Sequence, residues 1–158
     1  MEQRFTVQFV SQEWARTGEL IDLSYRVLYR PFGLALPTGE AATNAEWMHP
    51  GPDTTIAVAL AETGTLLGGA RLLPAPGDPS RQVRQVAVVP DARGMGAGRA
   101  LMLALEERAL AEGAREVWLN ARNSAYGFYG RLGYEVFGEE FISEVTGIPH
   151  TGMRKQLR

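Results

Sequence analysis

Three glycines separated by single residues, Gly94, Gly96 and Gly98, mark the segment of this chain with the most specific chemistry. Because glycine has no Cβ atom, a ligand can approach the backbone closely at each of them. The segment follows a valine-rich strand pattern and precedes a predicted helix. The first N–H groups of that helix lack partners and carry the positive end of its dipole. This combination predicts a binding site for a phosphate or pyrophosphate group.

Three phosphate-binding designs compete for this segment, and the spacing separates them. A nucleoside-triphosphate loop needs Lys followed by Ser or Thr after its last glycine, whereas Gly98 is followed by Arg99 and Ala100. A dinucleotide fingerprint needs G-x-G-x-x-G directly after the first strand, and neither that spacing nor that position is found here. The third design is Arg/Gln-x-x-Gly-x-Gly/Ala after a strand ending in Val-x-Pro, and Arg93–Gly98 fits it throughout. A tight turn that binds nothing is the alternative.

Arg93–Gly98 resembles the acetyl-CoA pyrophosphate loop of the GNAT superfamily of N-acyltransferases. Phe128–Tyr134 follows at the usual interval and resembles the superfamily signature Phe-Tyr-x-x-x-Gly-Phe/Tyr. Gly147–Met153 is similar to the ending of the ElaA-type branch, where Gly-Ile-Pro-His leads into the last strand. Together these motifs extend the resemblance over residues 54–157.

The resemblance implies an α+β fold. It predicts a mixed, mostly antiparallel sheet that is splayed between its fourth and fifth strands, with helices on both faces and the cofactor in the cleft. A length of 158 residues is most simply one domain over residues 1–158. The resemblance implies that this domain transfers an acetyl group from acetyl-CoA to a primary amine. A non-catalytic acyl-CoA-binding or sensing domain of the same fold is one alternative, and an unrelated nucleotide-binding domain is another.

The resemblance also indicates which residues hold the acyl donor. A pantetheine arm is peptide-like and is expected to bond the strand backbone, which the family pattern places at Val86, Ala87 and Val88. The pyrophosphate is expected to take backbone N–H groups from Gly94, Met95, Gly96, Ala97, Gly98 and Arg99. The side chains of Arg93 and Arg99 either pair with phosphate or are solvated charges. Asn123 either bonds the donor or caps a helix.

Tyr129 is the predicted catalytic acid, because a phenol near the sulfur can protonate the departing thiolate. Alternatively, Tyr129 is an aromatic core residue on a short helix, with no role in catalysis. A general base must take a proton from the ammonium form of the acceptor. The leading candidates are His150 and Glu144, and Glu140, Glu46 and Asp53 are further possibilities. His150 could equally fix the last strand through one hydrogen bond. Residues 47–49 line an acceptor pocket or pack onto the sheet.

Composition narrows the function further. The 158 residues carry a formal net charge of −2, which gives no electrostatic reason to expect nucleic acid or an anionic membrane as a partner. Basic residues gather around the glycine segment at Arg81, Arg84, Arg93 and Arg99. The absence of cysteine excludes an acyl-cysteine intermediate within the chain, and with only two histidines no metal site is expected. The expected protein is cytoplasmic and acts on a small-molecule or peptide amine. In this superfamily a homodimer is common.

The apolar periodicity predicts the elements that position these residues. Strands are expected at 4–10, 54–61, 65–73, 81–89, 116–120 and 134–137, with a last one after 147–150. Helices are expected at 17–30, 98–112 and 123–132. Residues 31–52 read as a long loop, or a loop with one short helix.

Overall fold

The computed structural model describes residues 4–35, 51–144 and 146–158, and within them the strands form one mixed sheet. The strands are β1 (Phe5–Val10), β2 (Thr55–Ala61), β3 (Leu66–Leu73), β4 (Ser80–Val88), β5 (Glu116–Arg122), β6 (Glu135–Val136), β7 (Phe141–Ile142) and β8 (Pro149–Gln156). The α-helices are α1 (Thr17–Leu28), α3 (Ala97–Ala111) and α4 (Tyr126–Arg131). Short 3₁₀ turns are η1 (Arg30–Phe32), η2 (Pro90–Met95) and η3 (Asn123–Ala125).

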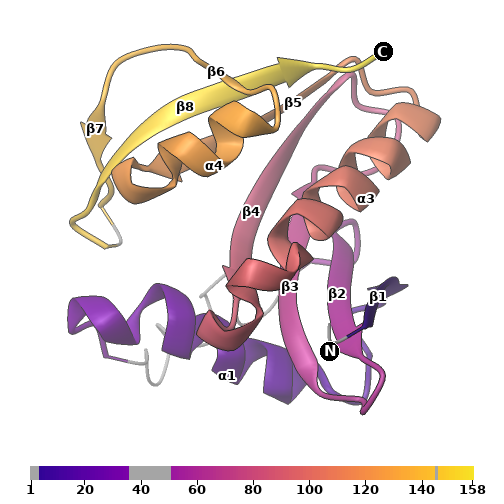
Figure 1. The fold of residues 1–158 in the computed structure, drawn as a ribbon. Helices are drawn as coiled ribbons and strands as arrows, with labels where there is room; N and C mark the ends of the chain where they lie inside the picture. Colours follow the sequence, from indigo (N-terminus) through magenta and orange to yellow (C-terminus); the bar gives the residue numbers. More distant parts are fainter. Residues whose placement is uncertain (1–3, 36–50, 145) are drawn as a thin grey trace.

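The sheet order is β1-β2-β3-β4-β5-β8-β6, with β7 also paired to β8. Every pair is antiparallel except β4 with β5, which are parallel. That parallel pair is short: Ser80, Arg81 and Gln82 lie opposite residues 116–118, and beyond this point the two strands separate (Figure 1). The expected splay between the fourth and fifth strands is confirmed.

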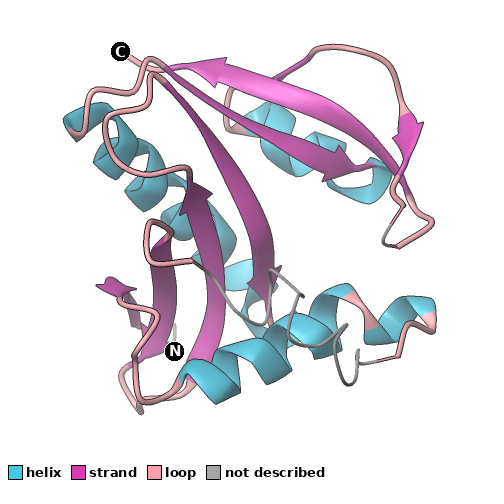
Figure 2. Cartoon of the chain, turned by 180° about the vertical axis from the view of Figure 1, so that it is seen from behind, coloured by secondary structure: helices cyan, strands magenta, loops and turns pink. Residues whose placement is uncertain are grey.

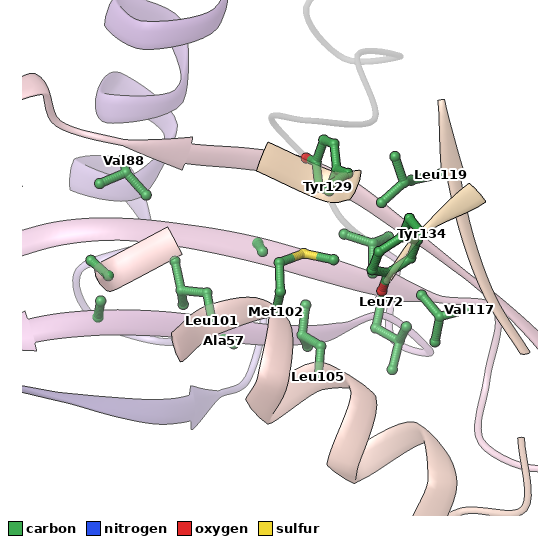
Figure 3. Packing of buried hydrophobic residues seen from close by; sticks show 14 of the residues in the cluster. Ala57, Leu72, Val88, Leu101, Met102, Leu105, Val117, Leu119, Tyr129 and Tyr134 are labelled. Atoms are coloured by element: carbon green, nitrogen blue, oxygen red, sulfur yellow. The ribbon is translucent and has the colours of Figure 1, made fainter. Parts of the chain in front are cut away.

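Helices cover both faces of the sheet, as Figures 1 and 2 show from opposite sides. On one face, Leu101, Met102 and Leu105 of α3 are fully buried and join Tyr129 of α4 in the main core (Figure 3). On the opposite face, Leu20 and Leu23 of α1 form a second core with buried side chains of β2, β3 and β4. We call these the α3 face and the α1 face.

The predicted element order is right, but several bounds differ. The helix expected at 17–30 ends at Leu28, and a 3₁₀ turn that contains Pro31 follows it, since proline cannot donate the next helical hydrogen bond. The helix expected at 123–132 begins as η3 and becomes α-helical only at Tyr126. Strand β7 was not expected, because two exposed residues carry no alternating pattern and form a strand only by pairing with β8.

Arg81 is a correction to the predicted cluster of basic residues around the phosphate segment. Its side chain is fully buried, and its Nη1 atom donates to Glu112 Oε1 at 3.0 Å. Nη2 lies 3.4 Å from the Thr55 hydroxyl. Arg81 therefore joins the C-terminal end of α3 to the sheet, and its charge is used inside the fold.

Three predictions fall wholly or mostly on residues outside the described ones: the long loop at 31–52, Glu46 as a general base, and residues 47–49 as an acceptor pocket. Among the helices that the structure describes, none is long and apolar enough to span a bilayer.

Candidate active site

The splay between β4 and β5 opens into a cleft of about 1420 Å³. Both halves of the sheet line it, together with the end of α1, the start of α3 and the loop before β8. Beyond Gln82 no strand among the described residues pairs with the edge of β4 that faces β5, so this edge offers backbone N–H and C=O groups to a ligand. The cleft therefore offers the kind of backbone edge that a peptide-like molecule could occupy.

The glycine segment borders this cleft on the α3 face. Arg93, Gly96, Gly98 and Arg99 line the cleft, and both arginine side chains are exposed. Gly96 has φ +82°, a left-handed conformation that favours glycine, and α3 begins directly after it. No side chain caps the start of α3. The N-terminal N–H groups of this 15-residue helix are thus left for an anion in the cleft.

The remaining residues predicted for the donor are placed differently from one another. Val86 and Val88 line the cleft, whereas the Ala87 side chain is buried in the second core beneath α1. Ala97 is fully buried and Met95 packs against the main core. Ala87, Met95 and Ala97 can therefore contribute only backbone groups. Gly94 is exposed just outside the lining.

Tyr129 lies at the wall of the cleft and is only 8% exposed. Its ring makes edge contacts with Phe128 and Tyr134, at centroid distances of 5.0 Å and 5.9 Å. Burial raises the pKa of Tyr129 above its ordinary value, and the charge of Arg122 only partly opposes this. A raised pKa keeps the phenol protonated, which is the state required of a proton donor. The hydroxyls of Tyr129 and Tyr134 point in different directions (Figure 3).

His150, the second predicted catalytic residue, also lines the cleft. Its Nδ1 atom lies 2.7 Å from the carbonyl oxygen of Ile148. A carbonyl can only accept, so Nδ1 carries the hydrogen and Nε2 carries the lone pair of the neutral ring. Phe141 stacks on the ring at a centroid distance of 5.9 Å, which fixes the plane of the imidazole. His150 can therefore make a structural hydrogen bond through Nδ1 and still offer Nε2 as a base.

His150 and Tyr129 lie on opposite faces of the sheet. Side chains alternate along a strand, and Leu119 and Ala121 of β5 point into the main core, so Arg122 points to the α1 face. His150 lies directly opposite Arg122 in the antiparallel register and shares that face. Tyr129 belongs to the main core on the α3 face. The cleft thus passes through the sheet, with one candidate residue on each side.

The other candidates do not reach the cleft. Glu144, Glu140 and Asp53 are exposed and are not part of its lining. Asn123 is exposed and also lies outside the lining, and the 3₁₀ turn that it begins has no side-chain cap. The structure brings together His150, Tyr129 and the start of α3, and it leaves the carboxylates at the surface.

A bulge in β4 was not anticipated from the sequence. The register of β3 with β4 shifts between Gly69 and Arg71, and Gln85 adopts φ +56°, which is uncommon for a residue with a side chain. Gln85 Nε2 donates to the Tyr29 hydroxyl at 2.9 Å, a contact that links the bulge to the end of α1. The one available signal was the polar pair Arg84–Gln85, which interrupts the alternation between Val83 and Val86.

Arg122 was also missed as a cleft residue. It lines the cleft, and its Nη2 atom donates to the Leu28 carbonyl at 2.7 Å, at the end of α1. Its guanidinium lies over the Phe32 ring, 4.7 Å from the centroid. Burial lowers the pKa of Arg122, and the nearby Tyr29 and Tyr129 phenols partly offset this. A partly desolvated cation thus spans the α1 side of the cleft.

Comparisons with known proteins agree with this geometry. Residues 21–134 match the model of the Acetyltransferase (GNAT) family. The chain is 39% identical over 75 residues to the uncharacterized N-acetyltransferase YjcF of Bacillus subtilis, an alignment that covers 47% of this chain and 52% of YjcF. The chain spans about half the length of the curated relatives it matches.

Two solved structures show the same fold over nearly the whole chain. Escherichia coli ElaA has a TM-score of 0.76 at 19% identity, covering 96% of this chain and 99% of ElaA. An aminoglycoside 6'-N-acetyltransferase complexed with coenzyme A has a TM-score of 0.72 at 16% identity, covering 94% of this chain and 96% of that enzyme's chain. With the family model matched over most of the sequence, the splayed sheet and its glycine segment place this chain in the GNAT acetyltransferase family.

Proposed function

We propose that this protein transfers an acetyl group from acetyl-CoA to a primary amine, by direct attack of the amine while both substrates are bound. The observation that carries this proposal is the cleft that passes through the sheet. It has the uncapped start of α3 and Tyr129 on the α3 face, and His150 on the α1 face. Such a cleft lets a donor and an acceptor approach one reacting centre from opposite sides.

The residues on the α3 face fit the acyl donor. A Cβ atom added at Gly94 or Gly96 would meet nothing within 4 Å, so the backbone there borders open space. At Gly98 a Cβ atom would come within 3.2 Å of the Phe128 ring, so a side chain here would require the ring to shift by a few tenths of an ångström. Acetyl-CoA supplies the activated acyl group, and the start of α3 with Arg93 and Arg99 would hold its pyrophosphate.

The side chains in the cleft can account for each proton. Nε2 of His150 takes a proton from the attacking amine, and a bond forms between the amine nitrogen and the acyl carbon. The bond between that carbon and sulfur breaks, and the Tyr129 hydroxyl donates its proton to the sulfur. The backbone N–H groups of β4 near Val86 stabilise the oxygen charge that develops between these events. No cysteine in the chain could carry the acyl group.

Binding of the donor is tested by thermal melts with acetyl-CoA, CoA, ATP and NAD. Acetyl-CoA or CoA at 100 times its dissociation constant should add about 2.7 kcal/mol and raise the melting temperature by several degrees. The double variant R93Q/R99Q should weaken binding about tenfold, because two charged hydrogen-bond donors are lost. Arg115→Gln, at an exposed arginine outside the cleft, is the matched control and should bind normally. No rise with acetyl-CoA or CoA would mean that the glycine segment has another role.

His150→Gln should lower turnover roughly 100-fold at neutral pH, within the range usual for a general base. The deficit should shrink as the pH rises, because a growing share of the amine is already deprotonated in solution. Rates of thiol release between pH 6.5 and 9.5 measure this directly. A deficit of the same size at every pH would assign His150 a structural role only.

A further inference from the structure

The α1 side of the cleft, where the acceptor would enter, is cationic and aromatic. Arg122 and Arg84 line it, together with Phe32 and Phe141, which are 47% and 43% exposed. Among the described residues that line the cleft there is no aspartate or glutamate. Glu140 and Glu144 flank β7 but remain outside the lining. A polycationic acceptor would find no described carboxylate in this cleft.

Arg122 is held in one position there. The Leu28 carbonyl accepts one hydrogen bond from Nη2, and the Phe32 ring covers one face of the guanidinium. A guanidinium has five N–H donors, so its fork retains others for a second partner. No carboxylate of the described residues forms an ion pair with it. The acidic side chains of α1 are engaged locally, as Asp22 is with Arg26 at 2.8 Å.

We propose that the acceptor amine carries a carboxylate group, which binds the Arg122 guanidinium, on an aromatic or apolar body that packs against Phe32 and Phe141. This deepens the proposed function and rests on it. A planar carboxylate matches the guanidinium fork with two parallel hydrogen bonds, and the partial burial of Arg122 strengthens them. Because His150 and Arg122 are directly opposite in the register of β5 and β8, the amine and the carboxylate would lie near each other, as in an amino acid.

The test compares matched acceptors that differ only in this group: phenylalanine, phenylalaninamide and 2-phenylethylamine, with kanamycin as a polycationic amine. Thiol release at saturating acetyl-CoA gives kcat and KM for each. The acid should have a specificity constant about tenfold to a hundredfold above the amide, mostly through a lower KM. Equal or better use of the amide, or use of kanamycin alone, would overturn the inference.

Variants assign the preference to Arg122. Arg122→Gln should reduce the ratio of acid to amide close to one, and Arg122→Lys should restore it in part, since lysine keeps the charge but lacks the fork. Arg154→Gln is the matched control and should keep the full ratio. Arg154 lies on the same face of β8 as His150, but outside the cleft. Like Arg122, its guanidinium lies over an aromatic ring, 5.3 Å from the centroid of Phe137.

The outcomes separate this inference from the proposed function. If Arg122→Gln only lowers the melting temperature and leaves the ratio of specificity constants for acid and amide unchanged, the inference is wrong. Arg122 then serves only to hold the end of α1 against β5. Binding of acetyl-CoA without acetylation of any carboxylate-bearing amine also overturns it, and leaves donor binding intact. Failure to bind acetyl-CoA removes the proposed function and the inference together.

Discussion

Tyr129→Phe is expected to lower kcat by about 10³-fold, with little change in the affinity for acetyl-CoA. The phenol lines the cleft and its pKa is raised by burial, so it is a proton donor rather than an anion throughout the working range. Phenylalanine keeps the edge contacts with Phe128 and Tyr134 but has no proton to give. Steady-state thiol release and acetyl-CoA titration of the same preparation measure the two effects separately.

Tyr126→Phe provides the matched control on the same helix. The Tyr126 hydroxyl donates to Thr151 Oγ1 and is not part of the cleft lining. Its loss should cost about 1 kcal/mol of stability and leave turnover nearly unchanged. If Tyr129→Phe binds acetyl-CoA and turns over like the unmodified protein, Tyr129 is an aromatic core residue. A protein that binds acetyl-CoA but acetylates no amine before any substitution would instead be a non-catalytic binding domain.

Glu112→Gln is expected to destabilise the fold by about 3 kcal/mol, because it leaves the charge of Arg81 buried without its carboxylate. A small part of this loss is recovered, less than about 1 kcal/mol, since Glu112 lies at the C-terminal end of α3, where a negative charge is unfavourable. For a chain of this size the melting temperature should fall by about 5–10 °C. Chemical denaturation gives the free energy of unfolding directly.

Arg81→Met should cost less than Glu112→Gln. It replaces the buried ion with an apolar side chain of similar length, and Glu112, whose side chain is 21% exposed, can turn to water. Neither variant should alter the affinity for acetyl-CoA, because Arg81 and Glu112 lie outside the cleft lining. Equal losses, or a larger loss for Arg81→Met, would contradict the view that an unpaired buried charge dominates the cost.

The strands, the helices and the glycine segment could be predicted from local properties of the sequence. The spacing of apolar residues predicted the strands and helices to within a few residues, because a buried face repeats every two residues in a strand and every 3.6 in a helix. The segment Arg93–Gly98 was recognisable because its requirements, glycines and a helix start, are contained in one short stretch. The element order indicated an α+β sheet with helices on its faces, whereas the splay between the fourth and fifth strands was predicted from the resemblance to the GNAT superfamily.

Contacts between distant residues could not be read in the same way. Nothing near Arg81 in the sequence indicates Glu112, and nothing near Arg122 indicates the end of α1. In the sequence alone both arginines resemble ordinary surface charges, and only the folded structure shows their partners. The same limit applied to the candidates for a general base, because the spacing of the sequence did not rank them. Only the tertiary structure showed that His150 lines the cleft while Glu144 is exposed outside it.

The sequence by itself determined the fold class, the family and the position of the glycine segment, because these follow from local periodicity and from short contiguous motifs. Only the tertiary structure decided which side chains share the cleft, which face of the sheet each one occupies and which charges are used inside the fold. Those properties depend on strand register and on the divergence of β4 from β5, and both are set by the packing of the whole sheet between its helices.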